Sequence, residues 1–452
     1  MDARDVQAKR DGQAERIVPH DGPLGDAHAS VEHAGDAHAA DAHISALRAV
    51  SAPSRVAEPA EGITAEELAL ATRNHGLPLE ALRYEVTPPG LHYVLTHYDI
   101  PTVDAAGADD WTLTVRGLVR TQLSLDMTTL RSFPAVTHRV TMECAGNGRA
   151  RLTPRPVSQP WLVEAVGTAD WTGVPLRTLL AEAEVEPDAV EAVFTGADHG
   201  VERGVEQDYQ RSLPLSDATA DDPEVLVAYE MNGAPLPPQH GHPVRLVVPG
   251  WYGMAHVKWL RDIALTSTPF TGFQQTVAYR YRRSADNPDD PGEPVTRIAP
   301  RALMIPPGFP DFMSRTRVVR PGPVQLEGRA WSGHAPVTKV EVSTDDGETW
   351  TEAALQDGRD RHDRRSGRDR RGGHDRRGGH DGPDGHDGLK GSAWVWRSWR
   401  TTWEAAPGTH VLTARATDAA GHTQPLDQPW NRGGFGNNFV QRIPVICLPR
   451  GD

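Results

Sequence analysis

The sequence predicts an α+β domain followed by an all-β, immunoglobulin-like sandwich domain. Residues 61–275 mix helix-like and strand-like segments without the regular alternation that a doubly wound parallel sheet requires. Residues 321–452 contain short segments with period-two alternation and turn signals between them, which is typical of a β-sandwich. Residues 276–320 are rich in Pro and Arg and have few periodic segments, so we expect an extended linker there.

Local signals in the first half predict individual elements. Thr64-Ala65-Glu66-Glu67 is a capping-box signature, so we expect a helix to begin after Thr64 and to end at Gly76. The alternation over 111–118 predicts a strand, and the pattern over 174–185 predicts a helix. Apolar runs predict two further strands, 225–229 and 244–248. A Gly-x-Gly-x-x-Gly turn or phosphate loop is not found where a strand meets a helix, so we do not expect a nucleotide-binding domain.

The second half contains several strand candidates, which are 324–331, 337–343, 393–403, 410–417 and 439–447. Residues 357–391 interrupt them with repeated Arg-Asp-Arg-Arg and Gly-Gly-His-Asp units and almost no apolar residues. This composition predicts a surface loop. Its basic half could contact a polyanion, but acidic residues interleave throughout it, which favours a tolerated insertion.

The first 60 residues form a tail rich in His, Ala and Asp that lacks large apolar side chains, so we expect it to be disordered. Four of its histidines recur every five residues, at His28, His33, His38 and His43. A five-residue period drifts around a helix and offers no single metal-binding face. A solvated tail is therefore favoured over a metal site.

Composition excludes several classes of function. The formal net charge of −14 argues against a nucleic-acid partner, because phosphate binding needs a basic face. A run of about 18 apolar residues is missing, so we expect no membrane span. The charged segment 1–18 contains neither a secretory signal nor a twin-arginine start, so we expect a cytoplasmic protein. Two cysteines cannot form a disulfide framework, although a single Cys144–Cys447 bridge would be conceivable.

Cys144 is the most informative residue. It follows an apolar and charged approach and precedes Ala145-Gly146-Asn147-Gly148-Arg149. The two glycines allow a ligand to approach the backbone closely, and Asn147 and Arg149 offer polar groups. A thiolate at such a turn is a candidate ligand for a transition metal, whereas a lone cysteine elsewhere is more often a buried structural residue.

The Cys144 segment, with its Cys-Ala-Gly-Asn run and trailing arginine, resembles the molybdenum-binding loop of the sulfite oxidase family. Other segments agree in the family's order: Arg73-Asn74-His75 upstream, His240-Gly241-His242-Pro243-Val244-Arg245 and 248–260 downstream, and then Gly328-Arg329-Ala330-Trp331. The resemblance covers roughly residues 61–447 and implies the family's catalytic domain over 61–275 and its dimerisation domain over 321–452.

The cofactor implied by this resemblance is molybdenum held by molybdopterin, with Cys144 as the protein's metal ligand. A pterin with a phosphate needs cations and hydrogen-bond donors along a groove. The positions that match the family's cofactor contacts are Thr72, Arg73, Asn74, His75, Asp198, His240, Arg245, His256, Val257 and Lys258.

The resemblance also implies an anion-binding pocket for the substrate. Arg73 matches the family's anion-binding arginine, whose fork suits an oxyanion. Tyr279 matches the active-site tyrosine, although a small gap would exchange it for Tyr281, and Trp161 matches the pocket tryptophan. Arg432 follows the Trp-Asn pair one position earlier than the best-matched pattern, so its role in the pocket stays open.

The leading hypothesis is oxidation of sulfite to sulfate, with electrons passed to an external acceptor because no haem-binding motif is found. Reduction of nitrate or a sulfoxide on the same fold is the alternative. A cysteine-nucleophile hydrolase and a non-catalytic interaction protein are weaker hypotheses. We also expect a homodimer, in which some of four clustered tryptophans form an apolar patch: Trp394, Trp396, Trp399 and Trp403.

Overall fold

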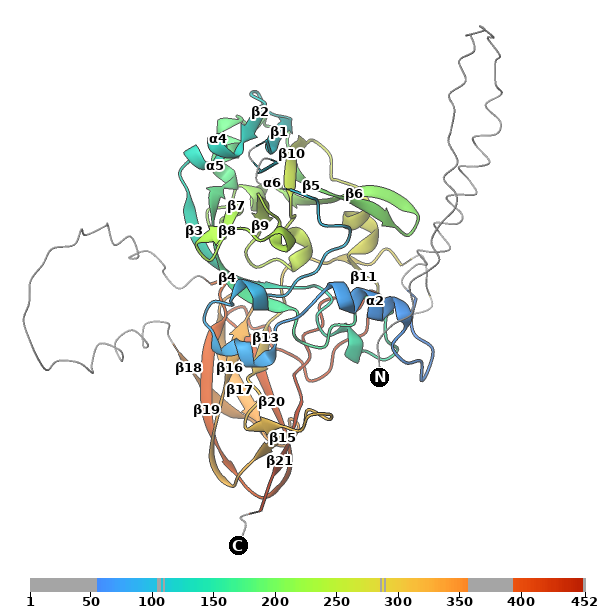
Figure 1. Ribbon diagram of the computed structural model, residues 1–452, viewed down its shortest axis with the longest axis vertical. Helices are drawn as coiled ribbons and strands as arrows, with labels where there is room; N and C mark the ends of the chain where they lie inside the picture. The colour runs from blue at the N-terminus through green and yellow to red at the C-terminus, as the bar shows by residue number, and fades with distance from the viewer. Residues whose placement is uncertain are drawn as a thin grey trace, which may run out of the picture.

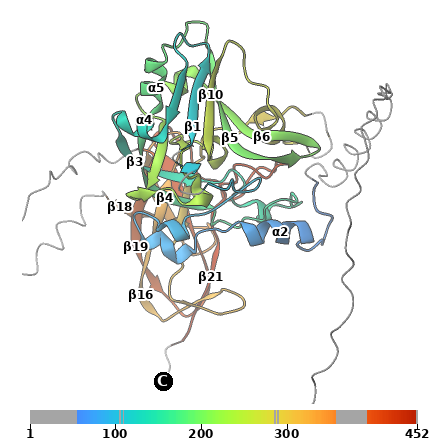
Figure 2. The same cartoon turned by 45° about the horizontal axis from the view of Figure 1, so that its top comes forward.

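The computed structural model of the protein describes residues 55–103, 107–108, 110–284, 287, 290–356 and 393–449. The described chain forms two parts that lie end to end, a first part of sheets with short helices and a second part made of strands (Figure 1). Figure 2 shows α4 and α5 beside the strands of the first part, away from β16, β19 and β21 of the second. The predictions for the insertion 357–391 and for most of the tail 1–60 fall outside the described residues.

Helices are few and short. The capping box at Thr64 is confirmed: its Oγ1 accepts from Glu67 N at 3.1 Å, and Glu67 Oε2 accepts from Thr64 N at 2.9 Å. The helix ends earlier than Gly76, because Asn74 is already extended. The prediction for 174–185 was too long, since Val174 and Pro175 close a strand. The helices are α2 (Ala65–Arg73), α4 (Met127–Ser132), α5 (Leu176–Glu182), α6 (Leu215–Ala218) and a π-helix, η6 (Gln274–Ala278), with 3-10 turns η1 (Leu79–Arg83), η2 (Pro89–Leu91), η3 (Arg149–Arg151), η4 (Pro238–His240) and η5 (Gly253–Ala255).

Two sheets build the first part. One has the order β2-β1-β10-β5-β6 and includes the predicted strand β1 (Thr112–Gly117). Its other strands are β2 (Leu123–Asp126), β10 (Leu260–Thr266), β5 (Glu191–Glu202) and β6 (Val205–Pro214). The other has the order β3-β4-β7-β8, with β9 also paired to β7. Its strands are β3 (Val136–Glu143), β4 (Val166–Pro175), β7 (Leu226–Met231), β8 (Ala234–Pro235) and β9 (Arg245–Val247).

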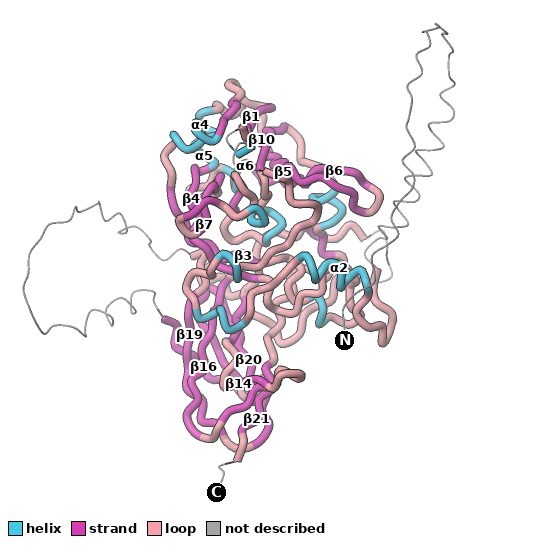
Figure 3. Tube along the Cα trace, in the orientation of Figure 1, coloured by secondary structure: helices cyan, strands magenta, loops and turns pink. Residues whose placement is uncertain are grey.

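The second part is one hydrogen-bonded path of nine strands in the order β13-β16-β19-β18-β17-β20-β21-β15-β14. Figure 3 shows β16, β19, β20 and β21 of this part as long strands joined by loops. The all-β prediction is confirmed, whereas the immunoglobulin-like description stays a prediction. Residues 301–319, expected in the linker, contribute three of the strands. The bounds are β13 (Arg301–Met304), β14 (Phe309–Pro310), β15 (Arg317–Val319), β16 (Gly322–Trp331), β17 (Val337–Ser343), β18 (Thr351–Gln356), β19 (Arg397–Ala405), β20 (Gly408–Asp418) and β21 (Ile443–Cys447), and a small separate pair joins β11 (Arg280–Tyr281) to β12 (Glu293–Pro294).

The two parts share a hydrogen-bonded seam at the outer edge of β3. Thr141 N donates to Trp394 O at 3.0 Å, and Trp396 N donates to Thr141 Oγ1 at 2.8 Å. Residues just before β19 therefore satisfy backbone groups of an edge strand that lies about 250 positions earlier.

The apolar residues form separate cores, which exclude the conceivable Cys144–Cys447 bridge and take up the clustered tryptophans. Cys144 packs in the core around β3 and β4, whereas Cys447 packs in the core of the second part, and both are free thiols. Trp396, Trp399 and Trp403 are buried, with exposed fractions of 4%, 1% and 9%. The clustered tryptophans therefore serve packing, because each ring fills a core or the seam between the two parts.

Candidate active site

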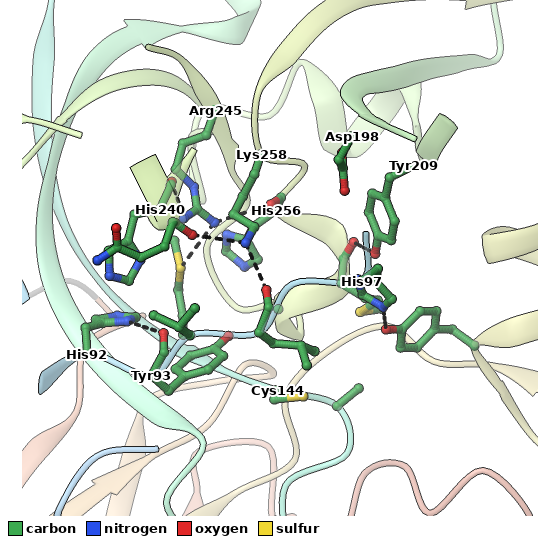
Figure 4. A pocket seen from close by; sticks show the side chains of 18 residues that line it. His92, Tyr93, His97, Cys144, Asp198, Tyr209, His240, Arg245, His256 and Lys258 are labelled. Atoms are coloured by element: carbon green, nitrogen blue, oxygen red, sulfur yellow. Dashed lines mark hydrogen bonds between the residues drawn. The ribbon is translucent and has the colours of Figure 1, made fainter. Parts of the chain in front are cut away.

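A cleft of about 640 Å³, part of it open to solvent, lies within the first part of the protein. Its walls come from the segment before β1, the end of β3, and the turns around η4 and η5 (Figure 4). The lining residues are His92, Tyr93, Val94, Leu95, His97, Met142, Cys144, Ala145, Asp198, Tyr209, Gln239, His240, Arg245, Gly253, Met254, His256, Lys258 and Tyr279.

Cys144 lies on one wall of this cleft, at the residue that follows β3 (Figure 4). A tight turn holds it, because Asn147 N donates to Cys144 O at 3.0 Å and Gly148 adopts a φ of 95°. Burial raises the pKa of the Cys144 thiol, and nearby Arg149 opposes this rise. The thiol is therefore protonated in the cofactor-free protein, and a bound metal would displace its proton.

Two buried cations face the cleft from the opposite wall. Arg245 Nη1 donates to His240 O at 2.9 Å, and Lys258 Nζ donates to Leu95 O at 2.8 Å. Burial lowers the pKa of Arg245 to about 10. Burial lowers the pKa of Lys258 to about 7, and the charge of Arg245 adds to this shift. Both partners are neutral carbonyls, so an anion in the cleft would stabilise both cations.

The histidines of the cleft are neutral at pH 7. Burial lowers the pKa of His92 to about 4, of His240 to about 2 and of His256 to about 3. His256 is held at both ring nitrogens, since Nδ1 accepts from Val248 N at 3.1 Å and Nε2 lies 3.1 Å from Trp251 O. His256 lines the cleft, and both of its ring nitrogens have partners within the chain, so its role as a cofactor contact stays a prediction.

Unsatisfied buried atoms show what kind of molecule the cleft would bind. His92 Nε2 and Asp198 Oδ1 are buried without a hydrogen-bond partner in the structure. Asp198 reaches the cleft from a bulge in β5, and burial raises its pKa to about 6. A ligand with ring N–H groups, acceptors and an anionic end would satisfy these atoms and the two cations together.

The described residues contain no group of three or more His, Cys, Asp or Glu side chains arranged to hold a bare metal ion. A metal in this cleft would therefore depend on a non-protein ligand, with Cys144 as the protein's contribution. The donor set thus fits a molybdenum–molybdopterin cofactor, with Cys144 to the metal, Asp198 and His92 to ring groups, and Arg245 and Lys258 to anionic groups.

An aromatic and hydrogen-bonded cluster closes the other end of the cleft. His97 Nε2 and Tyr279 Oη share a hydrogen bond of 2.7 Å, and the His97 ring lies 4.8 Å from that of Tyr209. The Tyr279 ring packs at 5.0 Å on Phe435, whose other neighbour is the Arg149 guanidinium at 5.1 Å. Tyr279 follows directly after the π-helix η6, an element that is frequent at functional sites.

Four predicted residues are not among those that line the cleft, and their role as cofactor or anion contacts stays a prediction: Thr72, Arg73, Asn74 and His75. Arg73 Nη2 donates to Tyr98 O at 2.7 Å, and its side chain is 40% exposed. Asn74 Oδ1 accepts from Thr96 N at 2.9 Å, while His75 pairs with Val94 through a β-bridge. The segment therefore supports the cleft wall from behind. His97, which sequence reasoning missed, takes the position inside.

Three other predicted residues also do not line the cleft, namely Trp161, Val257 and Arg432. Trp161 is buried in the same core as Cys144, and Val257 is fully buried. The backbone N of Arg432 donates to Arg282 O at 2.8 Å, and its side chain does not line the cleft. Tyr279 lines it and Tyr281 does not, so the structure distinguishes the two tyrosines.

The missed residues come mainly from one stretch. His92-Tyr93 and His97-Tyr98 are two His-Tyr pairs five residues apart in an apolar segment that ends before Pro101. Paired polar aromatics in an otherwise apolar segment were the available signal, because buried His and Tyr need partners.

Comparison with known proteins agrees with this geometry. Residues 97–274 match the family described as oxidoreductase molybdopterin binding domain, and residues 310–447 match the Mo-co oxidoreductase dimerisation domain. The chain is 30% identical over 383 residues to mitochondrial sulfite oxidase of Homo sapiens, covering 80% of this chain and 62% of that protein. It is 30% identical over 398 residues to NADH nitrate reductase of Lotus japonicus, covering 82% of this chain and 40% of that protein. The chain thus spans less than two thirds of the length of these relatives.

The sulfane dehydrogenase SoxCD of Paracoccus pantotrophus shares the fold, with a TM-score of 0.64, 23% identity, and coverage of 91% of this chain and 92% of that one. The first match includes most of the residues that line the cleft, and the second includes most of the nine-stranded part. The chain belongs to the sulfite oxidase family of molybdopterin-dependent oxidoreductases.

Proposed function

We propose that this protein oxidises sulfite to sulfate at a molybdenum–molybdopterin cofactor and passes two electrons to an external acceptor. The observation that carries this proposal is the position of the Cys144 thiol in a cleft with two buried cations and unsatisfied polar atoms. The overall reaction takes sulfite and water to sulfate, two protons and two electrons. When bound, the cofactor supplies the centre for this two-electron oxygen-atom transfer.

The residues of the chain have distinct roles in this proposal. Arg245 and Lys258 compensate the negative charge of the cofactor, and Asp198 accepts from its ring N–H groups. Burial makes these interactions stronger than they would be in water. Cys144 supplies the protein's ligand to the metal.

The substrate side is formed by the aromatic end of the cleft. Tyr279 Oη can donate to an oxyanion or to His97 Nε2, because burial keeps His97 neutral with a pKa of about 4. Arg149, buried beside Cys144, contributes positive charge that attracts an oxyanion. Phe435 and Tyr209 cover this end and limit the access of water.

Nitrate reduction is the second candidate, because the chain is as similar to a nitrate reductase as to a sulfite oxidase. A cysteine-nucleophile hydrolase is disfavoured, since burial raises the pKa of Cys144 where a nucleophile needs it lowered.

The test is expression in a host that makes the cofactor, followed by elemental analysis for molybdenum and activity assays. We expect about one molybdenum per chain and sulfite-dependent reduction of ferricyanide. Nitrate-dependent oxidation of reduced methyl viologen without sulfite oxidation would favour the second candidate. Protein that is folded but free of molybdenum and pterin would contradict both. We also propose that the protein is a homodimer, because the second part matches a dimerisation domain.

A further inference from the structure

Arg211 in β6 is a buried cation behind the aromatic end of the cleft, with an exposed fraction of 2%. Its guanidinium forms no ion pair with a carboxylate of the described residues, and its Nε is buried without a hydrogen-bond partner. Burial lowers the pKa of Arg211, but a guanidinium remains charged at pH 7. An apolar side chain would fill this position at a lower cost in stability. A buried charge without a counter-charge is instead typical of a functional site.

Arg211 connects β6 to the segment that presents Tyr279. Its Nη1 donates to the backbone oxygen of Gln274, the first residue of the π-helix η6. Its guanidinium carbon lies over the Tyr279 ring, 5.5 Å from the ring centroid, and Tyr279 follows directly after η6. Tyr209, which lines the cleft, stands two residues before Arg211 and so on the same face of β6. Arg211 therefore holds both ends of the segment that carries the Tyr279 hydroxyl.

The hydroxyl of Tyr279 is the group through which Arg211 can act, because Arg211 itself does not line the cleft. Tyr279 Oη shares a hydrogen bond of 2.7 Å with His97 Nε2, and a hydroxyl can bind a further partner in the cleft. A cation over the face of a phenol ring draws electron density from the ring. The O–H group then becomes a stronger hydrogen-bond donor, above all to an anionic acceptor.

The carboxylate nearest to this arrangement is bonded elsewhere. Glu202 Oε2 accepts from the side-chain amide of Gln274 at 2.8 Å, whereas Arg211 binds the backbone oxygen of the same residue. The charge of Arg211 is therefore not cancelled by direct pairing with Glu202. An oxyanion bound at Tyr279 would supply negative charge near Arg211 in a poorly hydrated environment, where such attraction is stronger than in water.

We propose that Arg211 is a positioning residue for the substrate oxyanion. It holds the Tyr279 ring in place, and its charge strengthens the hydrogen bond that Tyr279 Oη donates to the oxyanion. The proposal rests on the proposed function, because it assigns Arg211 to the substrate end of the same cleft. It also gives that end a charge preference: the attraction grows with the charge of the anion, so divalent sulfate gains more from Arg211 than monovalent nitrate does.

The test is isothermal titration calorimetry of the molybdenum-loaded enzyme with sulfate and with nitrate, beside steady-state kinetics with sulfite. Arg211→Met removes the charge and keeps an unbranched side chain. It should weaken sulfate binding about tenfold, the size of a desolvated cation–π contact, and raise the KM for sulfite by a similar factor. Nitrate binding should weaken only about threefold, because nitrate carries half the charge. The kcat should change less than the KM, and Arg211→Lys, which retains the charge, should recover most of the loss.

Arg317→Met in β15 is the matched control. Arg317 is also buried, with an exposed fraction of 5%, and is also held by a backbone oxygen, since its Nε donates to Pro307 O at 2.7 Å. It lies in the second part, so this variant should leave the sulfate dissociation constant within about twofold. A double-mutant cycle isolates the route through Tyr279. In a Tyr279→Phe background, Arg211→Met should weaken sulfate binding by less than about twofold.

Unchanged sulfate binding in Arg211→Met would overturn the proposal, as would a tenfold loss that persists in the Tyr279→Phe background. Failure of Arg211→Lys to bind sulfate more tightly than Arg211→Met would show that packing, and not charge, is what matters. Melting temperature and molybdenum content establish that each variant is folded and loaded, and Arg211→Gln replaces Arg211→Met if the latter does not fold. Anion binding is measured without turnover. Binding that depends on Arg211 in an enzyme that does not oxidise sulfite would therefore contradict the proposed reaction alone.

Discussion

The carboxylate of Glu143 and the guanidinium of Arg301 form an ion pair that is shut off from solvent, with Oε1 and Nη1 2.8 Å apart and side chains 2% and 0% exposed. Glu143 precedes Cys144 directly, whereas Arg301 begins β13 in the second part. The same carboxylate accepts from Asn147 Nδ2 at 2.9 Å and from Trp331 Nε1 at 2.8 Å. The turn that presents Cys144 is therefore fixed by residues from both parts of the chain.

Replacing Glu143 with Gln should lower the free energy of unfolding by about 3–5 kcal/mol, because Arg301 would remain buried without a counter-charge. Urea denaturation of the cofactor-free protein measures this effect. The matched control is Glu293→Gln, which breaks the exposed pair with Arg283 and should cost about 1 kcal/mol or less. Adding Arg301→Met to Glu143→Gln should restore part of the loss. Equal effects of the buried and exposed substitutions would contradict a structural role for the buried pair.

Cys144→Ser should abolish sulfite oxidation while leaving the circular dichroism spectrum unchanged, because a hydroxyl is a much poorer metal ligand than a thiolate. Cys447→Ser is the internal control, since Cys447 is also free and buried but lies in the core of the second part. Elemental analysis and steady-state assays of both variants provide the readout. Normal turnover of molybdenum-loaded Cys144→Ser protein would show that Cys144 is not the metal ligand.

Tyr279→Phe should reduce kcat/KM by about tenfold to a hundredfold with unchanged cofactor content, because it removes the hydroxyl that bonds to His97 at 2.7 Å. Tyr281→Phe makes the same chemical change two residues away and outside the cleft, so its kcat/KM should stay near that of wild type. The opposite ranking of the two variants would place the functional hydroxyl on Tyr281.

A feature could be predicted from the sequence when its residues lie in one short, continuous segment. The capping box at Thr64 was readable because its hydrogen bonds connect residues only three positions apart. Cys144 was readable because its small-residue turn is continuous in the sequence. Asp198, His240, Arg245, Lys258 and Tyr279 were found through the resemblance, and the structure brings all of them to the same cleft as Cys144.

What the sequence could not show depends on packing between segments. His75 pairs through a β-bridge with Val94, which lines the cleft, so the segment of His75 lies beside the stretch that carries His92 and His97. Only the three-dimensional structure shows that His97 lines the cleft, whereas Arg73 lies outside the lining and donates a hydrogen bond to Tyr98 O. The prediction of an exposed tryptophan patch was wrong for the same reason. Period-two spacing places Trp394 and Trp396 on one face of a strand but cannot show what covers that face.

The cofactor-free protein should lose stability as pH falls from 6.5 to 4. Burial lowers the pKa of four cleft histidines, to about 4 for His92 and His97, about 3 for His256 and about 2 for His240. The unfolded chain binds these protons near pH 6.5, so it holds more protons than the folded chain throughout this range. The free energy of unfolding should therefore fall by up to about 1.4 kcal/mol per pH unit for each histidine. Burial raises the pKa of Asp198 to about 6 and also raises the pKa of Glu143, and these two carboxyl groups act in the opposite direction.

Urea denaturation at a series of pH values measures this slope, and His92→Gln/His97→Gln should make it shallower. His199→Gln is the control. Hydrogen bonds to Asp208 and Glu206 raise the pKa of the exposed His199, so its protonation stabilises the folded state. Its replacement should therefore not make the slope shallower. A slope unaffected by the double substitution would contradict neutral, buried imidazoles in the folded protein.

Deletion of residues 357–391, with a short Gly-containing turn in their place, should leave activity and melting temperature nearly unchanged. β18 ends at Gln356 and β19 begins at Arg397, and these strands are antiparallel neighbours with Gln356 paired to Ser398. A hairpin turn can connect such strands, and the cost of loop closure changes slowly with length. Sulfite oxidation and light scattering measure the outcome. Aggregation or loss of molybdenum in the deletion variant would show that the insertion has a structural role.

The seam at β3 has a consequence for how this enzyme can be divided. Thr141 in the edge strand bonds to Trp394 and Trp396, which come from far along the chain. A fragment that stopped before residue 393 would leave backbone N–H and C=O groups of the β3 edge without these partners. Those groups could then pair with a strand of another molecule, including another copy of the fragment. During synthesis on the ribosome, the Cys144 turn therefore emerges long before the residues that shield its strand. The nascent first part must stay soluble through that interval, which makes this enzyme a poor subject for domain-by-domain expression.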